Sequence, residues 1–271
     1  MAGVNNVSKS MKILMLHGYT QSGPLFHAKT KALEKSLHKT FPGISLHYPT
    51  GPIRLKVSEV PGHSPSGDDS DEIEAYGWWK RSDASDPPEY IGIEDGLATV
   101  AKTIEAEGPF DGVLGFSQGA ALAAMVSSLL EGDSRKEAFK AARTRSKLAM
   151  PFPSSFARLT QPPLRFCVAY SGFIAPGERY SGFYQPCIRT PVCHFVGSMD
   201  TVVEEARTNT LIDAAGGQEK TTVVVHPGGH FVPNQRQYLD TVVSFIQAHM
   251  ADTSGHSDTP EERVEDMDVP F

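Results

Sequence analysis

Residues 110–130 read FDGVLGFSQGAALAAMVSSLL, and this stretch indicates how the chain folds. The run 110–116 is short and apolar, which is typical of a buried strand, and the segment 118–130 is apolar, alanine-rich and long enough for a helix. Residues 115–119, between the two, match the pattern G-x-S-x-G. A strand, this pentapeptide and a helix in direct succession predict a strained turn that presents Ser117 as a nucleophile.

Apolar runs and helical patterns alternate on both sides of this stretch. Short apolar runs predict further strands at 11–16, 44–48, 164–170, 192–196 and 221–225. Apolar residues at helical spacing predict further helices at 24–40, 90–107 and 234–250. Three segments read as loops or insertions: 49–88, 131–163 and 171–186. This alternation predicts an α/β fold, with a mostly parallel sheet that carries helices on both faces.

Length and composition are those of an ordinary globular protein with 39% hydrophobic and 21% charged residues. We expect one domain at 11–250, a flexible N-terminus at 1–10 and a disordered acidic tail at 251–271. A net charge of -7 argues against nucleic-acid binding, which needs a basic surface. No run reaches the roughly 18 apolar residues of a membrane span, and three cysteines are too few for a disulfide framework. These features predict a cytoplasmic protein with no nucleic-acid or membrane partner.

A serine hydroxyl needs a base to remove its proton during attack, so a histidine is expected on a loop after a later strand. His230 in HPGGHFVP has this position, after the strand at 221–225 and before the last helix. His226 is the alternative, but it lies nearer the strand end, where it would pack or cap. The intervening residues 227–229 read Pro-Gly-Gly and prevent the helix of a zinc-binding H-E-x-x-H motif, so no metal site is predicted.

The acid that orients the histidine is expected between Ser117 and His230, at the carboxyl end of a strand. Asp200 in GSMD directly follows the predicted strand at 192–196. Its carboxylate would accept a hydrogen bond from the imidazole and hold the tautomer that can take the serine proton. Glu204 and Glu205 are the alternatives, and they would lie on the solvent face of the next helix.

Acyl transfer also needs N–H donors for the oxyanion that forms at the substrate carbonyl. The backbone N–H of Gln118, next to the nucleophile, is one expected donor. The loop after the first strand, HGYT, offers a second donor in the N–H of Tyr19 or, alternatively, of Thr20. His17 is expected to bind backbone groups of this loop rather than to act as a base.

Two groups of aromatic residues lie on predicted loops. Trp78 and Trp79 belong to the loop at 49–88, and Phe173 belongs to the loop at 171–186. These side chains could line a pocket for the acyl group of a substrate. The equally weighted alternative is that they anchor long loops to the core.

The motifs together resemble the FSH (family of serine hydrolases) group of α/β-hydrolases over about residues 11–250. The residues that carry the resemblance are LHGYTQSG, GFSQGAALA, AYSGF, GSMDTVV and HPGGHFVP. By this resemblance the fold is that of an α/β-hydrolase and the catalytic triad is Ser117, Asp200 and His230. Similar proteins include filamentous-fungal esterases and thioesterases linked to polyketide pathways, and the human ovarian-cancer-associated hydrolase.

These patterns predict a serine esterase or thioesterase that cleaves a small-molecule or carrier-bound acyl ester or thioester without a cofactor. The resemblance extends this to polyketide biosynthesis, with an acyl carrier domain of a polyketide synthase as a partner. A basic segment could steer such an acidic partner, and its basic residues are Arg135, Lys136, Lys140, Arg143, Arg145 and Lys147. A solvated helix is the simpler interpretation of this segment. A ligand-binding protein on a hydrolase scaffold and a general short-chain carboxylesterase are the alternative functions.

Overall fold

The computed structural model describes residues 10–60 and 74–251. The predicted flexible N-terminus and acidic tail lie outside these ranges, except for Ser10 and Ala251. No helix in the described ranges is long and apolar enough to cross a lipid bilayer.

A six-stranded sheet forms the centre of the molecule, with the strand order β10-β9-β8-β7-β1-β2. Every neighbouring pair in it is parallel, so the prediction of a mostly parallel sheet is confirmed. Its strands are β1 (Lys12–Leu16), β2 (Ser45–His47), β7 (Gly112–Phe116), β8 (Phe166–Tyr170), β9 (Val192–Gly197) and β10 (Thr222–His226). The strands β7, β8 and β9 are buried along their whole length, because helices cover both faces of the sheet.

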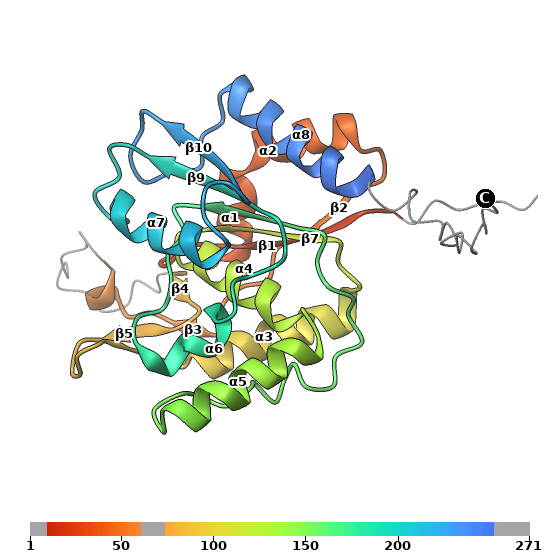
Figure 1. Cartoon of the computed structure of the whole chain (residues 1–271). Coiled ribbons are helices and arrows are strands. Elements are labelled where there is room, and N and C mark those ends of the chain that lie inside the picture. The colour runs from red at the N-terminus through yellow and green to blue at the C-terminus, as the bar shows by residue number, and fades with distance from the viewer. Residues whose placement is uncertain (1–9, 61–73, 252–271) are drawn as a thin grey trace, which may run out of the picture.

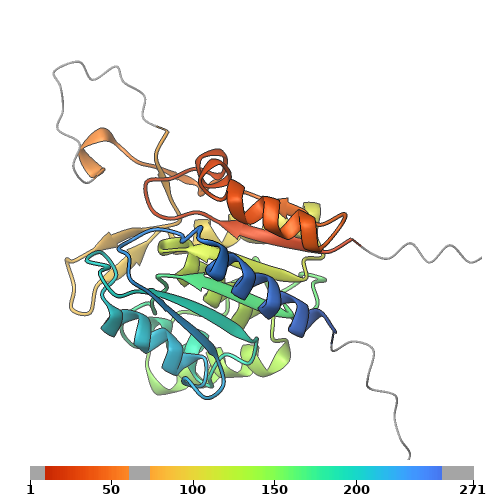
Figure 2. The same ribbon diagram turned by 90° about the horizontal axis from the view of Figure 1, so that it is seen from above.

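Helices pack on both faces of this sheet, as the views in Figures 1 and 2 show. One face carries α1 (Gly23–Lys29), α2 (Lys31–Thr40) and α8 (Arg236–Ala251). The other carries α3 (Ile93–Glu107), α4 (Gln118–Leu129), α5 (Asp133–Arg145), α6 (Ser181–Tyr184) and α7 (Glu205–Ala214). All twelve residues of α4 are buried, which explains why its sequence is apolar all round rather than amphipathic.

The helix predicted at 24–40 is two helices that meet at Thr30. Thr30 has φ −103° and ψ 13°, and its hydroxyl donates a hydrogen bond to the carbonyl of Phe26 at 2.8 Å. Threonine hydroxyls compete in this way with regular backbone hydrogen bonding. The apolar spacing continues through this break, so spacing alone could not reveal it.

The segment predicted as a loop at 49–88 also contains regular structure where it is described. Two small antiparallel sheets form, one from β3 (Ile53–Arg54) and β4 (Tyr76–Gly77) and one from β5 (Lys80–Ser82) and β6 (Glu89–Ile91), and a 3-10 turn, η1, spans Val57–Glu59. The helix expected from residue 90 therefore begins only at Ile93. Gly92, with φ 82°, makes the turn between β6 and that helix, a conformation that glycine adopts without strain.

The charged insertion at 131–163 forms α5, and one of its basic residues is a core residue. Arg135 is 1% exposed, and its Nη2 lies 2.6 Å from the Oε2 of buried Glu131. Its guanidinium also donates hydrogen bonds to backbone carbonyls of the segment before β9, at Gly182, Phe183, Pro186 and Cys187. The prediction that Arg135 belongs to a basic docking surface is therefore wrong, because its charge is used to tie α5 to this segment.

We expect Arg135→Ala to lower the free energy of unfolding by about 3–5 kcal/mol, because it removes the buried cation of this pair and leaves the Glu131 carboxylate with only the more distant Arg189, at 3.7 Å, as an ion-pair partner among the described residues. Urea unfolding followed by circular dichroism would measure this loss. Lys136→Ala is the matched control, since Lys136 pairs at 3.0 Å with exposed Asp133 and should contribute less than about 1 kcal/mol. Equal losses for the two variants would contradict a structural role specific to Arg135.

Candidate active site

Ser117 lies on a sharp turn between β7 and α4, at the carboxyl edge of the sheet. Its backbone has φ 53° and ψ −117°, a strained conformation for a residue with a side chain. A Cβ on Gly115 would lie 2.2 Å from the carbonyl oxygen of Gly119, and a Cβ on Gly119 would lie 2.1 Å from that of Leu16. Only glycine fits at these two positions, so the packing explains the spacing of the G-x-S-x-G pattern.

The structure brings Ser117, His230 and Asp200 together from three separate strand ends. The Nε2 of His230 lies 3.0 Å from the Oγ of Ser117, and its Nδ1 lies 2.8 Å from the Oδ2 of Asp200. The ring of Phe116 packs against the imidazole with 4.7 Å between the ring centroids. This geometry lets the imidazole donate through Nδ1 to the carboxylate while Nε2 accepts from the serine hydroxyl.

Four donors surround the carboxylate of Asp200. Its Oδ1 accepts hydrogen bonds from the backbone N–H groups of Val202 and Val203, both at 2.9 Å. Its Oδ2 accepts from His230 and from the hydroxyl of Ser171, both at 2.8 Å. Burial by itself raises the pKa of Asp200, but the hydrogen bonds from His230, Val203 and Ser171 outweigh burial and hold that pKa below its usual value. The carboxylate is therefore charged and held in one orientation.

Ser171 is a site residue that no pattern in the sequence assigned to the site, although it lies in the AYSGF motif. It directly follows β8, is 1% exposed and has φ 49°, which is unusual for a residue other than glycine. A serine that holds this conformation while it donates to the orienting carboxylate is a positioning residue. The only signal in the sequence was the Ser-Gly pair after a predicted strand.

We expect Ser171→Gly to lower kcat/KM about tenfold, because the carboxylate loses one of the donors that orient it. Glycine adopts a positive φ without strain, so the free energy of unfolding should stay equal or rise. Steady-state kinetics and urea unfolding would measure the two effects. Ser198→Gly, at an exposed position near Asp200, is the control and should leave kcat/KM unchanged. Activity that falls only in step with stability would contradict a positioning role.

The two expected oxyanion donors lie at the carboxyl ends of β1 and β7, where the order in which strands are added to the sheet reverses. The chain leaves β1 toward β2 on one side and later adds β7 on the other, so the loops after β1 and β7 diverge at their carboxyl ends. Such switch points are where open α/β sheets bind ligands. Within the described residues, the backbone N–H groups of Tyr19 and Gln118 have no acceptor, whereas the N–H of Thr20 donates to the carbonyl of Tyr76 at 2.9 Å. Of the two candidates in the first loop, Tyr19 is therefore the one available to a substrate.

Side chains hold this oxyanion loop in place. His17 is fully buried, and its two ring nitrogens bind backbone groups of Gly18 and Gly51 at 2.8 and 2.9 Å, so its expected structural role is confirmed. The indole N–H of Trp78 donates to the carbonyl of His17 at 2.9 Å. The side-chain amide of Gln118 accepts from the N–H of Trp78 at 2.7 Å and donates to the carbonyl of Trp79 at 2.9 Å. Gln118 thus ties the nucleophile turn to the loop that carries the tryptophans.

The predicted substrate-binding aromatic residues lie mostly in the core. Trp78 and Trp79 are 0% and 2% exposed, and Trp79 stacks on Tyr90 with 4.8 Å between the ring centroids. Neither indole has surface available to a ligand, so the prediction that they line a substrate pocket is not supported and anchoring is their role. Phe173 is nearly buried and lies under the guanidinium of Arg207, 4.4 Å from the ring centroid.

The alternative triad residues do not reach the imidazole or the serine. His226 is buried, and its ring lies 5.3 Å from the ring of Phe231 and 5.8 Å from that of Tyr238, so it packs as expected at the strand end. Glu204 and Glu205 are exposed at the start of α7 and make no bond to His230. In the described parts of the chain, no group of three or more histidine, cysteine or acidic side chains is placed to hold a metal ion.

Burial lowers the pKa of two histidines, His17 and His194, to about 4. For His17, burial outweighs the hydrogen bond to Gly18, which by itself raises the pKa. His194, on β9, is fully buried, and neither of its ring nitrogens has a hydrogen-bond partner among the described residues. An unfolded histidine titrates near 6.5, so between pH 6.5 and 4 the unfolded chain binds protons that the folded protein does not.

We therefore expect the protein to lose stability as the pH falls from 7 to 5, by about 2 kcal/mol for each of these two histidines. Above pH 6.5 this contribution to stability is fully present. Urea unfolding at both pH values would measure the loss for the wild type and for His194→Leu, which should lose about 2 kcal/mol less. His38→Leu, at an exposed position, should match the wild type. An unchanged loss in His194→Leu would contradict the effect of burial.

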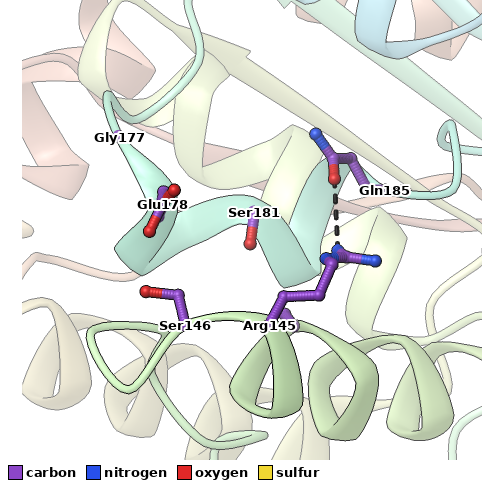
Figure 3. Close-up of a pocket in the computed structure, with 7 residues that line it drawn as sticks. Arg145, Ser146, Gly177, Glu178, Ser181 and Gln185 are labelled. Carbon is purple, nitrogen blue, oxygen red and sulfur yellow. Dashed lines mark hydrogen bonds between the residues drawn. The ribbon is translucent and has the colours of Figure 1, made fainter.

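Two pockets differ in their relation to these residues. A pocket of about 180 Å³ is lined by His230 together with residues of α1, of the loops after β1 and β10, and of the end of β7. A larger one, of about 370 Å³, lies between α5 and the segment 177–185, where Arg145 donates a hydrogen bond to Gln185 (Figure 3). Of these two pockets, only the smaller is lined by one of the residues Ser117, Asp200 and His230, namely His230.

Comparison with known proteins agrees with this geometry. The model of the family described as "Serine hydrolase (FSH1)" matches residues 7–242 of the chain. The chain belongs to the FSH1 serine hydrolase family. This FSH1 member is 32% identical to "Family of serine hydrolases 3" of Saccharomyces cerevisiae, over 97% of the chain and 94% of that relative. It is 30% identical to "Esterase OVCA2" of Danio rerio, over 88% of the chain and 96% of that relative.

A third relative is longer than the chain. The "Dihydrofolate reductase" of Schizosaccharomyces pombe is 30% identical over 89% of the chain, which spans only 48% of that protein. Among solved structures, acyl-protein thioesterase 2 of Zea mays aligns with a TM-score of 0.56 at 20% identity, over 89% of this FSH1 member and 94% of the thioesterase. This likeness shows that the chain has the α/β-hydrolase fold.

Proposed function

We propose that the protein hydrolyses carboxylic esters or acyl thioesters through an acyl intermediate on Ser117. The observation that carries this proposal is the chain of two hydrogen bonds, 3.0 and 2.8 Å long, from the hydroxyl of Ser117 through His230 to Asp200. A serine hydroxyl bound to a neutral imidazole can attack a carbonyl, because the imidazole takes its proton as the new bond forms.

In the first half-reaction, the Oγ of Ser117 attacks the carbonyl carbon and its proton moves to the Nε2 of His230. The C–O or C–S bond to the leaving group then breaks, and the leaving alcohol or thiol takes the proton from Nε2. In the second half-reaction, water gives a proton to Nε2 and attacks the acyl-serine. Collapse releases the carboxylic acid and returns the proton to Ser117.

The other residues stabilise charge that appears during these steps. Asp200 holds the Nδ1–H of His230 and stabilises the imidazolium. The free N–H groups of Gln118 and Tyr19 would donate to the oxyanion of each tetrahedral intermediate. Phe173, next to the strand end that carries Ser171, is the proposed contact for the acyl group. None of these steps requires a cofactor.

Labelling with a fluorophosphonate probe tests this function, because the probe reacts only with an activated serine. We expect labelling of the wild type and turnover of p-nitrophenyl esters of rising chain length or of matched acyl thioesters. The ratio of kcat/KM for the two substrate types decides between ester and thioester. Preference for the shortest esters would favour a general carboxylesterase, and a folded but unlabelled protein would favour a ligand-binding role.

We also propose, from the resemblance to fungal pathway enzymes, a carrier-bound acyl thioester of polyketide biosynthesis as the natural substrate. Arg143, Arg145 and Lys147 remain exposed on and just after α5, whereas Lys136 and Lys140 pair with neighbouring acidic residues. These three cations could attract an acidic carrier domain and raise its association rate. Replacing both arginines with glutamate should slow hydrolysis of carrier-bound thioester at low salt and leave small esters unaffected; equal effects would contradict carrier docking.

The free thiol of exposed Cys187 is compatible with our proposed compartment, the cytoplasm.

A further inference from the structure

The pocket of about 180 Å³ beside His230 has a composition that the hydrolytic mechanism does not by itself require. Its walls come from two directions. Gln21, Phe26 and Lys29 follow β1, and Phe231 follows β10, with Phe116 and His230 between them. The pocket therefore opens onto the imidazole face of the site, between the loop that carries the oxyanion donor Tyr19 and the loop that carries His230.

The position of this pocket relates it to one part of the substrate, provided that the proposed function holds. The Nε2 of His230 takes the proton of Ser117 and must then pass it to the leaving atom. A general acid acts within hydrogen-bond reach, so the leaving group has to lie against the imidazole while the acyl group stays on the serine. The pocket that His230 lines is thus the place for the leaving group.

The walls of this pocket are mainly aromatic. Phe26 is fully buried behind the pocket, in the core between α1 and the sheet, and Phe116 packs on the imidazole. Phe231 is 43% exposed, so its ring has surface that a group in the pocket can contact. An apolar cavity of roughly 150 Å³ can hold benzene, so the volume here admits one ring or a chain of similar size.

A single unpaired cation lies at the edge of these aromatic walls. Lys29, the last residue of α1, is exposed and forms no ion pair with any carboxylate in the described parts of the chain. None of the described residues that line the pocket is acidic. The amide of Gln21 uses its Oε1 to accept from the N–H of Gly18 at 3.2 Å, which leaves its NH2 group available as a donor. A cation and an amide donor without an anionic partner favour a negatively charged group.

We propose that this pocket selects esters or thioesters whose leaving group carries a negative charge, a carboxylate or a phosphate, at the far end of a small apolar segment. The segment lies between Phe116 and Phe231, and the anion meets Lys29 and Gln21. Lys29 is then a specificity-determining residue. Its contribution to recognition is electrostatic, so it weakens as the salt concentration rises.

Matched acetate esters test this inference, because they keep the acyl group constant and change only the charge of the leaving group. The charged substrates are 4-acetoxybenzoate and 4-acetoxyphenyl phosphate, and the neutral one is methyl 4-acetoxybenzoate. We expect Lys29→Gln to lower the ratio of kcat/KM for charged to neutral ester by about tenfold, and Lys29→Glu to lower it further. High salt should reduce this ratio in the wild type. The larger loss among the two charged esters identifies carboxylate or phosphate as the preferred anion.

Lys31→Gln is the matched control, since Lys31 lies two residues further on, does not line the pocket and sits 3.9 Å from Glu34. It should leave the ratio unchanged. A ratio that is the same in wild type and Lys29→Gln, with hydrolysis intact, would overturn the leaving-group inference alone. Absence of both hydrolysis and fluorophosphonate labelling in the wild type would instead overturn the proposed function.

Discussion

Ser117→Ala is expected to reduce kcat about 10⁶-fold, because no other group at the site can form the acyl intermediate. The change removes one hydroxyl, which lies 3.0 Å from the Nε2 of His230. The glycines on either side allow the close backbone contacts of the turn, and those contacts do not depend on this hydroxyl. The variant should therefore fold as the wild type does, with the same circular dichroism spectrum and melting temperature.

Hydrolysis of a p-nitrophenyl ester and labelling by a fluorophosphonate would measure this loss, and both should disappear together. Ser127→Ala is the matched control, because Ser127 lies on α4 and its hydroxyl donates to the carbonyl of Ala123 rather than to a residue of the triad. This control should keep wild-type activity. Substantial turnover by a folded Ser117→Ala protein would remove the acyl-serine mechanism altogether.

Asp200→Asn is expected to reduce kcat by about 10⁴-fold while the fold stays intact. The structure explains why the substitution is so costly. The N–H groups of Val202 and Val203 both donate to Oδ1, so the amide oxygen of asparagine must take that position. The NH2 group then faces His230, whose Nδ1 has to accept. The imidazole proton moves to Nε2, which can no longer take the proton of Ser117.

The pH-independent kcat of Asp200→Asn would measure this effect. Glu204→Gln is the control, because Glu204 is exposed at the cap of α7 and makes no contact with the imidazole. Its activity should equal that of the wild type. A loss in Glu204→Gln comparable to that in Asp200→Asn would show that the acid has been assigned to the wrong residue.

Local patterns in the sequence were sufficient for the parallel sheet, the nucleophile turn and the choice of His230 over His226. Each of these patterns consists of residues close together in the chain. Gly115 and Gly119 are two residues from Ser117; Gly115 approaches the backbone of Gly119 within the strand-turn-helix unit, whereas Gly119 approaches the backbone of Leu16 at the end of β1. Asp200 was identifiable for the same reason, since it follows directly on a buried apolar run.

Only the tertiary structure decided what the charged and aromatic side chains do. In the sequence, Arg135 looks like a surface cation of its helix. It is buried in the structure, where its guanidinium pairs with Glu131 and donates to backbone carbonyls some fifty residues further along the chain. Trp78 looks like a pocket residue, yet its indole anchors the loop after β1. Ser171 became visible as a partner of Asp200, 29 residues later, only when β8 and β9 paired. Periodicity reports which face of an element is apolar, whereas partners distant in sequence depend on how the elements pack.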